Sequence, residues 1–350
     1  MGIAKCDGIN AMSQPLKHEY SDGIAHKAIA ILGNYPPPLG GVSVHIKRVM
    51  HKFKQQHNQV HHFDTLHRAT MAGYVMRLVW FLLRVKPDIV YYHTIDLNSR
   101  LVEFHLLTML KKIIGFQLVV VEHNCRHLYN RSAQYKTTFS MLMRAVDHLV
   151  LIGNATEKSY KANHIVMPRV TTIEAAFLPP DQQEEKAIIN TYPQELRAFI
   201  ESHTFIITVN AFQLTLLEGK DLYGIDQCIE LLRTLGDKGA GLIIVLGHIG
   251  NTPHYRLLKE RIALYALEDQ CLWIVGQKEL WPILKCSQVF LRPTLSDAES
   301  VSVQEALYFK VPVVASDVCI RPANVLTFKT GNVEDFYAKI NHLRNHLYAQ

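Results

Sequence analysis

The chain has 350 residues, of which 48% are hydrophobic and 19% are charged. This balance excludes an intrinsically disordered chain, a collagen-like repeat and a disulfide scaffold, and the length favours two domains over a single core. The six cysteines lie far apart without a C-x-x-C pair, which argues against a structural zinc site and fits the reduced thiols of a cytosol. The first 25 residues lack the pattern of a signal peptide, and no apolar run reaches the roughly 18 residues of a membrane span. We therefore expect a cytoplasmic protein.

The charge is distributed unevenly along the chain. Residues 1–180 contain 21 Lys and Arg against 11 Asp and Glu, a net charge of +10, whereas residues 181–350 contain 16 against 20, a net charge of −4. A basic first half predicts an anionic partner such as a phospholipid surface or a phosphorylated substrate. The alternative is a chance excess of solvated lysines in this half, with no partner. The basic residues form no run, and no aromatic RNA-binding motif accompanies them, so we expect no nucleic-acid partner.

The first half of the chain alternates β-branched runs with helical patterns, which is typical of parallel α/β layers. Residues 1–25 are polar and irregular and predict a disordered extension. The strands that follow read as nearly continuous apolar runs, as a sheet covered on both faces requires. Residues 26–180 therefore predict an N-terminal Rossmann-like domain, with strands at 28–32, 60–63, 88–93, 117–123 and 148–152 and helices at 42–56, 71–85 and 97–114.

Paired prolines and an acidic stretch interrupt this pattern and predict a linker at 181–185. The pattern then restarts over 186–350, with strands at 204–209, 241–246, 271–275, 288–291 and 311–315 and a closing helix at 333–347. We predict an α/β fold of two tandem doubly wound parallel-sheet domains, with the closing helix packed back toward the N-terminal domain. Because such sheets bind ligands at the carboxyl ends of their strands, the interdomain cleft is the expected site.

A glycine pair lies in the turn after the first strand. Gly40 and Gly41 follow three prolines and open the next helix, so the backbone can approach a ligand closely at a helix N-terminus. The G-x-G-x-x-G spacing of a dinucleotide site is absent. A plain structural turn is the alternative interpretation.

The strand at 117–123 ends in polar residues and places His123 at the edge of the cleft, where an imidazole can bond a ligand hydroxyl or phosphate. A satisfied structural histidine is the alternative, since the chain has 19 histidines. His57, His61 and His62 resemble a metal cluster, but no carboxylate accompanies them, and we interpret them as surface residues.

The strongest pattern is an acidic loop that leads into a helix. Asp297 and Glu305 are eight residues apart, one before the helix and one near its start, so both can face one ligand. The helix amides at 300–303 between them can bind a diphosphate. The alternative is a capping box in which Glu305 reaches back to the start of the helix at Ser302.

Together these motifs resemble family 4 glycosyltransferases, which have the two-Rossmann-domain GT-B architecture. The resemblance covers about residues 26–347. It is carried by the glycine pair within Gly40-Gly41-Val42-Ser43-Val44-His45, by His123, and by Asp297 followed by Glu305-Ala306 and Pro312-Val313-Val314-Ala315-Ser316.

The resemblance implies roles for these residues. Asp297 and His123 would contact the donor sugar, and Glu305 would hold the ribose of the nucleotide. The diphosphate would lie against the helix start at Ser300, Val301 and Ser302, with the glycine pair and Asn210 completing the donor site. The family's Arg after the first strand of the second domain is replaced by Ala211, so we assign Lys220 to the leaving diphosphate. Asp297 also replaces the family's usual Glu.

The resemblance further implies retaining transfer of a sugar from a UDP- or GDP-sugar to a glycan hydroxyl. No D-x-D motif occurs, so we expect no metal or other cofactor at the diphosphate. No side chain stands out as a covalent nucleophile, which favours same-face attack. A nucleotide-sugar epimerase and a non-catalytic nucleotide-sugar-binding protein are the alternatives.

The acceptor is expected on the basic N-terminal domain. Residues 75–86 are apolar nearly all round and carry Arg77, Arg84 and Lys86 at their edges, which suits a helix lying on an anionic bilayer; a core helix is the alternative. The membrane interpretation implies a peripheral protein on the cytoplasmic face of the inner membrane and a lipid-linked glycan acceptor in bacterial capsular or O-antigen synthesis.

Overall fold

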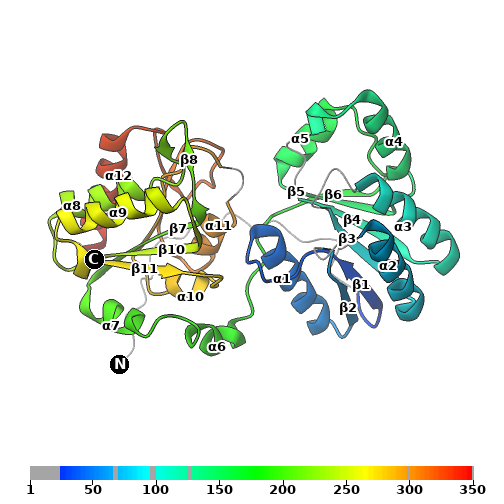
Figure 1. Cartoon of the computed structure of the whole chain (residues 1–350), viewed down its shortest axis with the longest axis horizontal. Coiled ribbons are helices and arrows are strands. Elements are labelled where there is room, and N and C mark those ends of the chain that lie inside the picture. Colours follow the sequence, from blue (N-terminus) through cyan, green and yellow to red (C-terminus); the bar gives the residue numbers. More distant parts are fainter. Residues whose placement is uncertain (1–23, 66–69, 95–99, 124–127, 298–299, 349–350) are drawn as a thin grey trace.

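A computed structural model describes residues 24–65, 70–94, 100–123, 128–297 and 300–348. It contains two lobes, each built on one parallel six-stranded sheet with helices on both faces (Figure 1). The predicted architecture of two doubly wound parallel sheets is confirmed. Of the predicted N-terminal extension, only the last two residues are described. Among the helices described here, none has both the length and the apolar character needed to cross a membrane.

The N-terminal sheet has the strand order β2-β1-β3-β4-β5-β6. Alternate residues of its strands enter two cores: Ile29 and Ile31 pack against α1, whereas Ala30 and Leu32 face the core that includes α2, α3 and α4. The strands are β1 (Ala28–Leu32), β2 (Gln59–Phe63), β3 (Ile89–Thr94), β4 (Gln117–Glu122), β5 (His148–Ile152) and β6 (Thr171–Glu174), and the helices are α1 (Gly41–Gln55), α2 (Met71–Val85), α3 (Arg100–Ile114), α4 (Ala133–Met143) and α5 (Asn154–Ala162).

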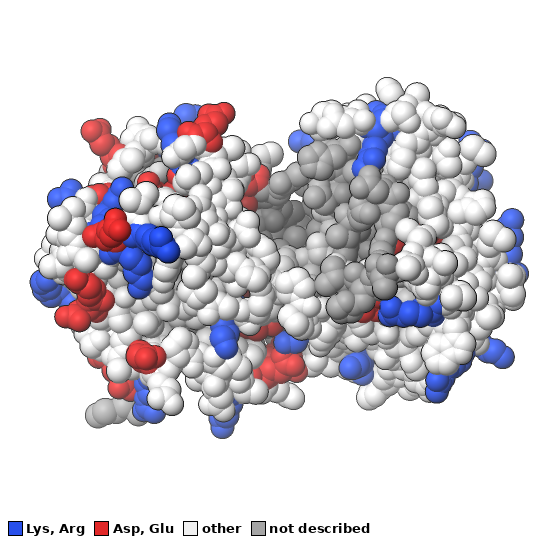
Figure 2. Space-filling model, in the orientation of Figure 1, with Lys and Arg blue, Asp and Glu red and all other residues white. Residues whose placement is uncertain are grey.

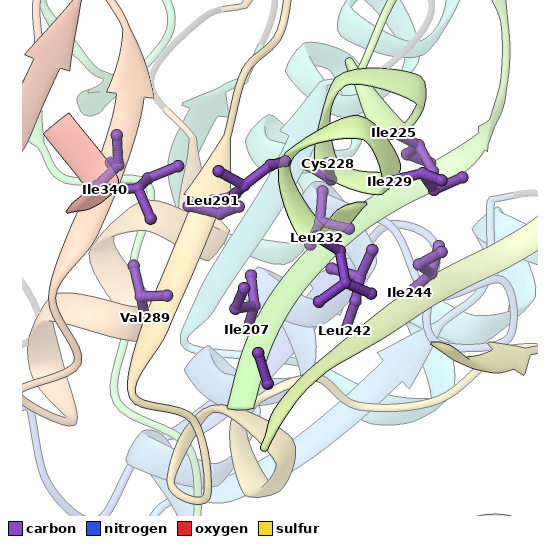
Figure 3. Close-up of a cluster of buried hydrophobic side chains, with 14 of the residues drawn as sticks. Ile207, Ile225, Cys228, Ile229, Leu232, Leu242, Ile244, Val289, Leu291 and Ile340 are labelled. Carbon is purple, nitrogen blue, oxygen red and sulfur yellow. The ribbon is translucent and has the colours of Figure 1, made fainter. Parts of the chain in front are cut away.

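The C-terminal sheet has the strand order β11-β10-β7-β12-β13-β14. Its strands are β7 (Phe205–Leu214), β10 (Ala240–Gly250), β11 (Cys271–Val275), β12 (Val289–Arg292), β13 (Val313–Ser316) and β14 (Leu326–Phe328), and β8 (Leu216–Leu217) and β9 (Lys220–Asp221) form a separate hairpin. The helices are α6 (Glu185–Ile189), α7 (Glu195–Ser202), α8 (Ile225–Leu235), α9 (Thr252–Leu264), α10 (Trp281–Leu284), α11 (Val301–Tyr308) and α12 (Val333–Tyr348). Figure 3 shows one of its cores, where α8 packs on β7, β10 and β12 through side chains such as Ile207, Leu232 and Leu291.

The last helix differs from the prediction. We expected it to pack back toward the N-terminal domain, but α12 packs on β13 and β14 of its own sheet. It buries Phe336, Ile340 and Leu343 in the core of Figure 3, because its apolar stripe matches that sheet face. The predicted linker at 181–185 lies between the two sheets; residues 182–184 form a short 3-10 helix and α6 begins at Glu185.

Both strand orders reverse direction at one point, and this positions the site. In the N-terminal sheet the chain winds outward from between β1 and β3, and in the C-terminal sheet from between β7 and β12. The crevice outside the carboxyl ends of the strands at such a point is where open α/β sheets bind ligands. The residues that follow β1, β3, β7 and β12 are therefore the candidates for a functional site.

Candidate functional site

Arg292 ends β12 at the reversal point of the C-terminal sheet. Its Nη1 donates a hydrogen bond of 3.2 Å to the backbone carbonyl of Asn210 on the neighbouring strand β7, and its guanidinium lies 5.1 Å from the ring centre of Tyr223. The side-chain oxygen of Asn210 is buried and has no hydrogen-bond partner among the described residues. Such an orphaned acceptor suits a ligand that brings a donor group.

Two arginines hold Asp297 in the loop after β12. Nε and Nη2 of Arg292 each donate to a different carboxylate oxygen at 3.0 Å, and Nη1 of Arg321 donates at 2.9 Å. Burial raises the pKa of Asp297, but the bonds from Arg292 and Arg321 outweigh it and lower that pKa. Two guanidinium charges and one carboxylate leave a net charge of +1, so the cluster still attracts an anion.

The helix α11 begins directly beyond this cluster. Ser300 is its N-cap residue, but its side chain makes no capping bond to the helix; its Oγ lies 3.0 Å from Oγ of Ser302. The first amides of an α-helix, here from Val301 on, have no acceptor within the helix and carry the positive end of its dipole. The start of α11 can therefore bind a phosphate, as the sequence predicts.

Glu305 lies inside α11 and does not cap it, so the capping-box interpretation is wrong. Its side chain is buried and accepts a short hydrogen bond from Nη2 of Arg48 on α1 of the other domain. Arg48 also donates to the carbonyl oxygen of Leu178 at 2.8 Å. Burial raises the pKa of Glu305, and Arg48 only partly opposes this. An ion pair between the two domains thus holds the carboxylate of Glu305, the group that the resemblance expects to bind the ribose.

The glycine loop brings the N-terminal domain against the start of α11. A Cβ atom placed on Gly41 would lie 4.0 Å from Cγ2 of Val301, and the amide of Leu39 donates to the side chain of Gln277. The Gly40 amide donates to Oγ of Ser43 at 2.9 Å, which fixes the turn. The lobes thus meet beside the predicted site.

His123 directly follows β4 and lies among histidines from distant parts of the sequence. Its Nε2 is 2.9 Å from Nδ1 of His93 on β3, and the His45 ring on α1 packs edge-on against it with centres 4.9 Å apart. Burial lowers the pKa of both His93 and His123 well below the usual value, and the neighbouring histidines lower it further. Both rings are therefore neutral at neutral pH.

Lys220 is exposed on the β8–β9 hairpin and makes no ion pair with any described residue. The chain just after this hairpin bonds the loop that follows Arg292, since the amide of Leu295 donates to the carbonyl oxygen of Leu222 at 2.8 Å. The assignment of Lys220 to the leaving diphosphate stays a prediction. Arg292 and Arg321 are two cations bonded to Asp297, and neither was predicted as a site residue. Arg292 was detectable, because it ends a buried strand at the position where the sheet rule expects ligand contacts. Arg321 carries no comparable signal, since it lies in the irregular loop after β13.

Gly224 packs against the loop that follows Arg292, and we predict that Gly224→Ala disturbs this loop. Gly224 adopts φ of +66°, and an added Cβ would lie 2.5 Å from the carbonyl oxygen of Pro293. Gly236 is the matched control, because it has φ of +60° and nothing within 4 Å. Gly236→Ala should cost about 1–2 kcal/mol of stability for the left-handed backbone alone. Gly224→Ala should cost measurably more in urea unfolding; equal costs for the two variants would contradict this.

Comparisons with known proteins fit this arrangement. Residues 217–347 match the family model "Glycosyl transferases group 1". A glycosyltransferase from Rickettsia africae has a similar structure, with 14% identity, a TM-score of 0.65 and coverage of 91% of this chain and 89% of that one. Anabaena HepE in complex with UDP gives 12% identity, a TM-score of 0.61 and coverage of 91% and 90%. An α,α-trehalose 6-phosphate synthase from Burkholderia multivorans has 11% identity and a TM-score of 0.59, and the match covers 92% of this chain and 91% of that one.

No curated protein sequence matches the chain significantly. At these identities the solved structures establish the fold, and the predicted GT-B architecture is confirmed by them. The family match adds the enzyme class for the domain that contains the Asp297 cluster and α11. The chain therefore has a GT-B fold, and the match of its residues 217–347 to the glycosyl transferases group 1 model supports a glycosyltransferase.

Proposed function

We propose that the protein is a family 4 enzyme that transfers a sugar, with retention of configuration, from a UDP- or GDP-sugar to a hydroxyl of a glycan. The observation that carries this proposal is the cationic cluster of Arg292, Asp297 and Arg321 beside the start of α11. HepE has been solved with UDP and with UDP-glucose, and a trehalose-6-phosphate enzyme of E. coli with UDP-2-fluoro glucose, which supports a nucleotide-sugar donor.

The leaving diphosphate would lie between the arginine cluster and the first amides of α11. Sugar transfer builds up negative charge on the leaving phosphate, and fixed positive groups that exclude water stabilise such charge. The two arginines and the helix start would supply this stabilisation, with Gly41 admitting the phosphate close to the backbone. The carboxylate of Asp297, held in place by both arginines, would accept hydrogen bonds from sugar hydroxyls.

Retention without a covalent intermediate would follow if the acceptor hydroxyl attacked the sugar on the same face from which the leaving phosphate departs. The departing phosphate would take the proton of that hydroxyl. The experiment is to supply UDP- and GDP-sugars with simple glycan acceptors and to determine the anomeric configuration of the product by NMR. A product with the donor's configuration and no trapped glycosyl-enzyme adduct in mass spectra is the expected result. An inverted product or a trapped adduct would overturn this mechanism.

The acceptor would be a lipid-linked glycan of surface-polysaccharide synthesis. The protein would meet this acceptor at a membrane, with α2 as the helix that contacts the lipid. This helix buries Tyr74, Leu78 and Leu82 but leaves Met76 67%, Trp80 62% and Leu83 46% exposed. On the face shown in Figure 2, the N-terminal lobe carries mainly Lys and Arg, which suits an anionic lipid surface. An exposed apolar stripe beside arginines is what an interfacial helix presents to headgroups.

This membrane contact predicts that the protein floats with vesicles of anionic phospholipid. Trp80→Glu should lower the bound fraction several-fold, because it places a carboxylate in the apolar stripe of α2. Tyr129→Glu is the matched control, since Tyr129 is 66% exposed in the same domain but lies outside α2. Absence of binding by the wild type, or equal loss in both variants, would remove the lipid-linked acceptor from the proposal.

A non-catalytic nucleotide-sugar-binding protein is the second candidate. The observation in its favour is Ala211, which stands where the resemblance expects an arginine that would stabilise the leaving diphosphate. Release of the nucleotide from a bound donor distinguishes the two candidates, because only a catalyst turns the donor over.

A further inference from the structure

Three histidines from distant parts of the sequence gather beside the carboxyl ends of β3 and β4. His45 comes from α1, His93 from β3 and His123 from the residue after β4. One ring nitrogen of each lies within 4.8 Å of those of the other two. His45 and His93 are buried and His123 is half-buried. Within the part of the chain that the structure describes, no other three His, Cys, Asp or Glu side chains gather in this way.

The spacing of the rings matches that of ligands around one metal ion. Zinc binds imidazole nitrogen at about 2.0–2.1 Å, so tetrahedral geometry separates two ligand nitrogens by about 3.4 Å and their ring centres by about 5 Å. The ring centres of these three histidines are 4.9, 5.2 and 5.8 Å apart. His93 Nδ1 and His123 Nε2 are 2.9 Å apart, a hydrogen-bond distance, so these nitrogens would move apart by about 0.5 Å and the rings would turn toward a common point to bind one ion.

The second ring nitrogen of His45 supports the same interpretation. Nδ1 of His45 lies 3.1 Å from the carbonyl oxygen of Ala176. A carbonyl only accepts, so Nδ1 carries the hydrogen and Nε2 of the neutral ring bears the lone pair. Metal-binding histidines commonly donate their second nitrogen to a backbone carbonyl in this way. The second nitrogen of His93, Nε2, is buried and has no hydrogen-bond partner among the described residues, so it lacks an acceptor of this kind.

We propose that His45, His93 and His123 bind one divalent transition-metal ion of the zinc class. Three nitrogen ligands and no carboxylate select Zn²⁺, Co²⁺ or Ni²⁺ over Mg²⁺ and Ca²⁺, which prefer oxygen. A three-histidine set leaves a fourth coordination position for water or a ligand. A pocket lined by His45, His93, Tyr91 and Glu174 lies beside the site and gives room for it. All three ligands belong to the N-terminal domain, so the binding can be tested without a nucleotide sugar.

The test is titration of the full chain, carrying a tag without histidine, with Co²⁺ and Zn²⁺. Visible absorption of Co²⁺ reports its coordination, and calorimetry gives the stoichiometry and affinity of Zn²⁺. We expect one ion per chain and visible bands of low-symmetry Co²⁺. His93→Phe keeps a ring in the buried position and should weaken binding at least about 100-fold, whereas His105→Ala, exposed on α3, should leave it unchanged.

The other outcomes overturn the proposal. They are the absence of a saturable site in the wild type, and equal affinity in the wild type and His93→Phe. Circular dichroism and thermal unfolding establish that each variant is folded. If His93→Phe does not fold, the half-buried His123→Phe replaces it with the same expectation.

Discussion

Arg292→Met is expected to lower kcat of sugar transfer by about 100- to 1,000-fold. Removal of one fixed donor that stabilises developing charge in an enzyme costs a factor of this size. In this chain the substitution also releases Asp297 from its two bonds to Arg292 and removes the net positive charge of the cluster. The remaining groups, Asp297 and Arg321, would have a net charge of zero. The measurement is release of nucleoside diphosphate from the donor under saturating conditions.

Two further variants make the Arg292 experiment specific. Arg292→Lys keeps the charge but cannot form the two-pronged bond to a carboxylate, so we expect an intermediate loss. Arg256→Met makes the same substitution at an exposed position on α9 and should leave kcat unchanged. If Arg292→Met is folded and retains more than about a tenth of the wild-type kcat, the cluster does not stabilise the leaving group.

Arg100→Met is expected to destabilise the N-terminal domain by about 3–5 kcal/mol. Arg100 and Glu122 are both fully buried, and Nη1 and Nη2 of Arg100 donate to the carboxylate at 2.7 and 3.1 Å. Thr94 and Tyr160 donate to the same carboxylate at 2.7 and 2.8 Å. Removing one partner of such a pair leaves a buried charge that two neutral hydroxyls cannot balance.

Hydrogen exchange measures this loss in one domain of a two-domain protein. A loss of 3–5 kcal/mol should speed exchange of the most protected amides in β3, β4 and β5 by roughly a hundred- to several-thousand-fold. Arg169→Met, at an exposed position of the same domain, should change exchange little. The double variant Arg100→Met with Glu122→Gln should lose less than the sum of the single variants. Strict additivity would show that the two charges are not coupled.

Much of the fold can be predicted because most strands are continuous apolar runs. The predicted strands at 28–32, 148–152 and 271–275 have the bounds that the structure gives. The edge strand β6, with the sequence Thr-Thr-Ile-Glu, was not predicted, since it is short, polar and half-buried. The packing of α12 was also mispredicted, because a helix's apolar stripe does not specify which sheet it covers.

The candidate site was predicted only where the chemistry is local in sequence. The loop from Asp297 to Glu305 carries its pattern within one segment, and the structure places it at the reversal point of the sheet. The partner of Glu305 is Arg48, 257 residues away, and no local pattern reveals such a pair. The histidine cluster, too, is formed by residues that lie far apart in the sequence. His61 and His62, which are neighbours in sequence, were interpreted as surface residues, whereas the three histidines that gather come from helix α1, strand β3 and the end of β4.

Nucleotide binding tests the central proposal most directly. Thermal unfolding is measured with UDP, GDP, ADP and CMP, for the wild type and for Glu305→Gln, which keeps the side chain's size. A ligand at about 100 times its Kd should stabilise the wild type by about 2.7 kcal/mol. We expect this for UDP or GDP, with most of it lost in Glu305→Gln but not in Glu195→Gln at an exposed position of α7. Absence of stabilisation by any nucleotide, or equal stabilisation in all three proteins, would contradict the donor site proposed for the cleft.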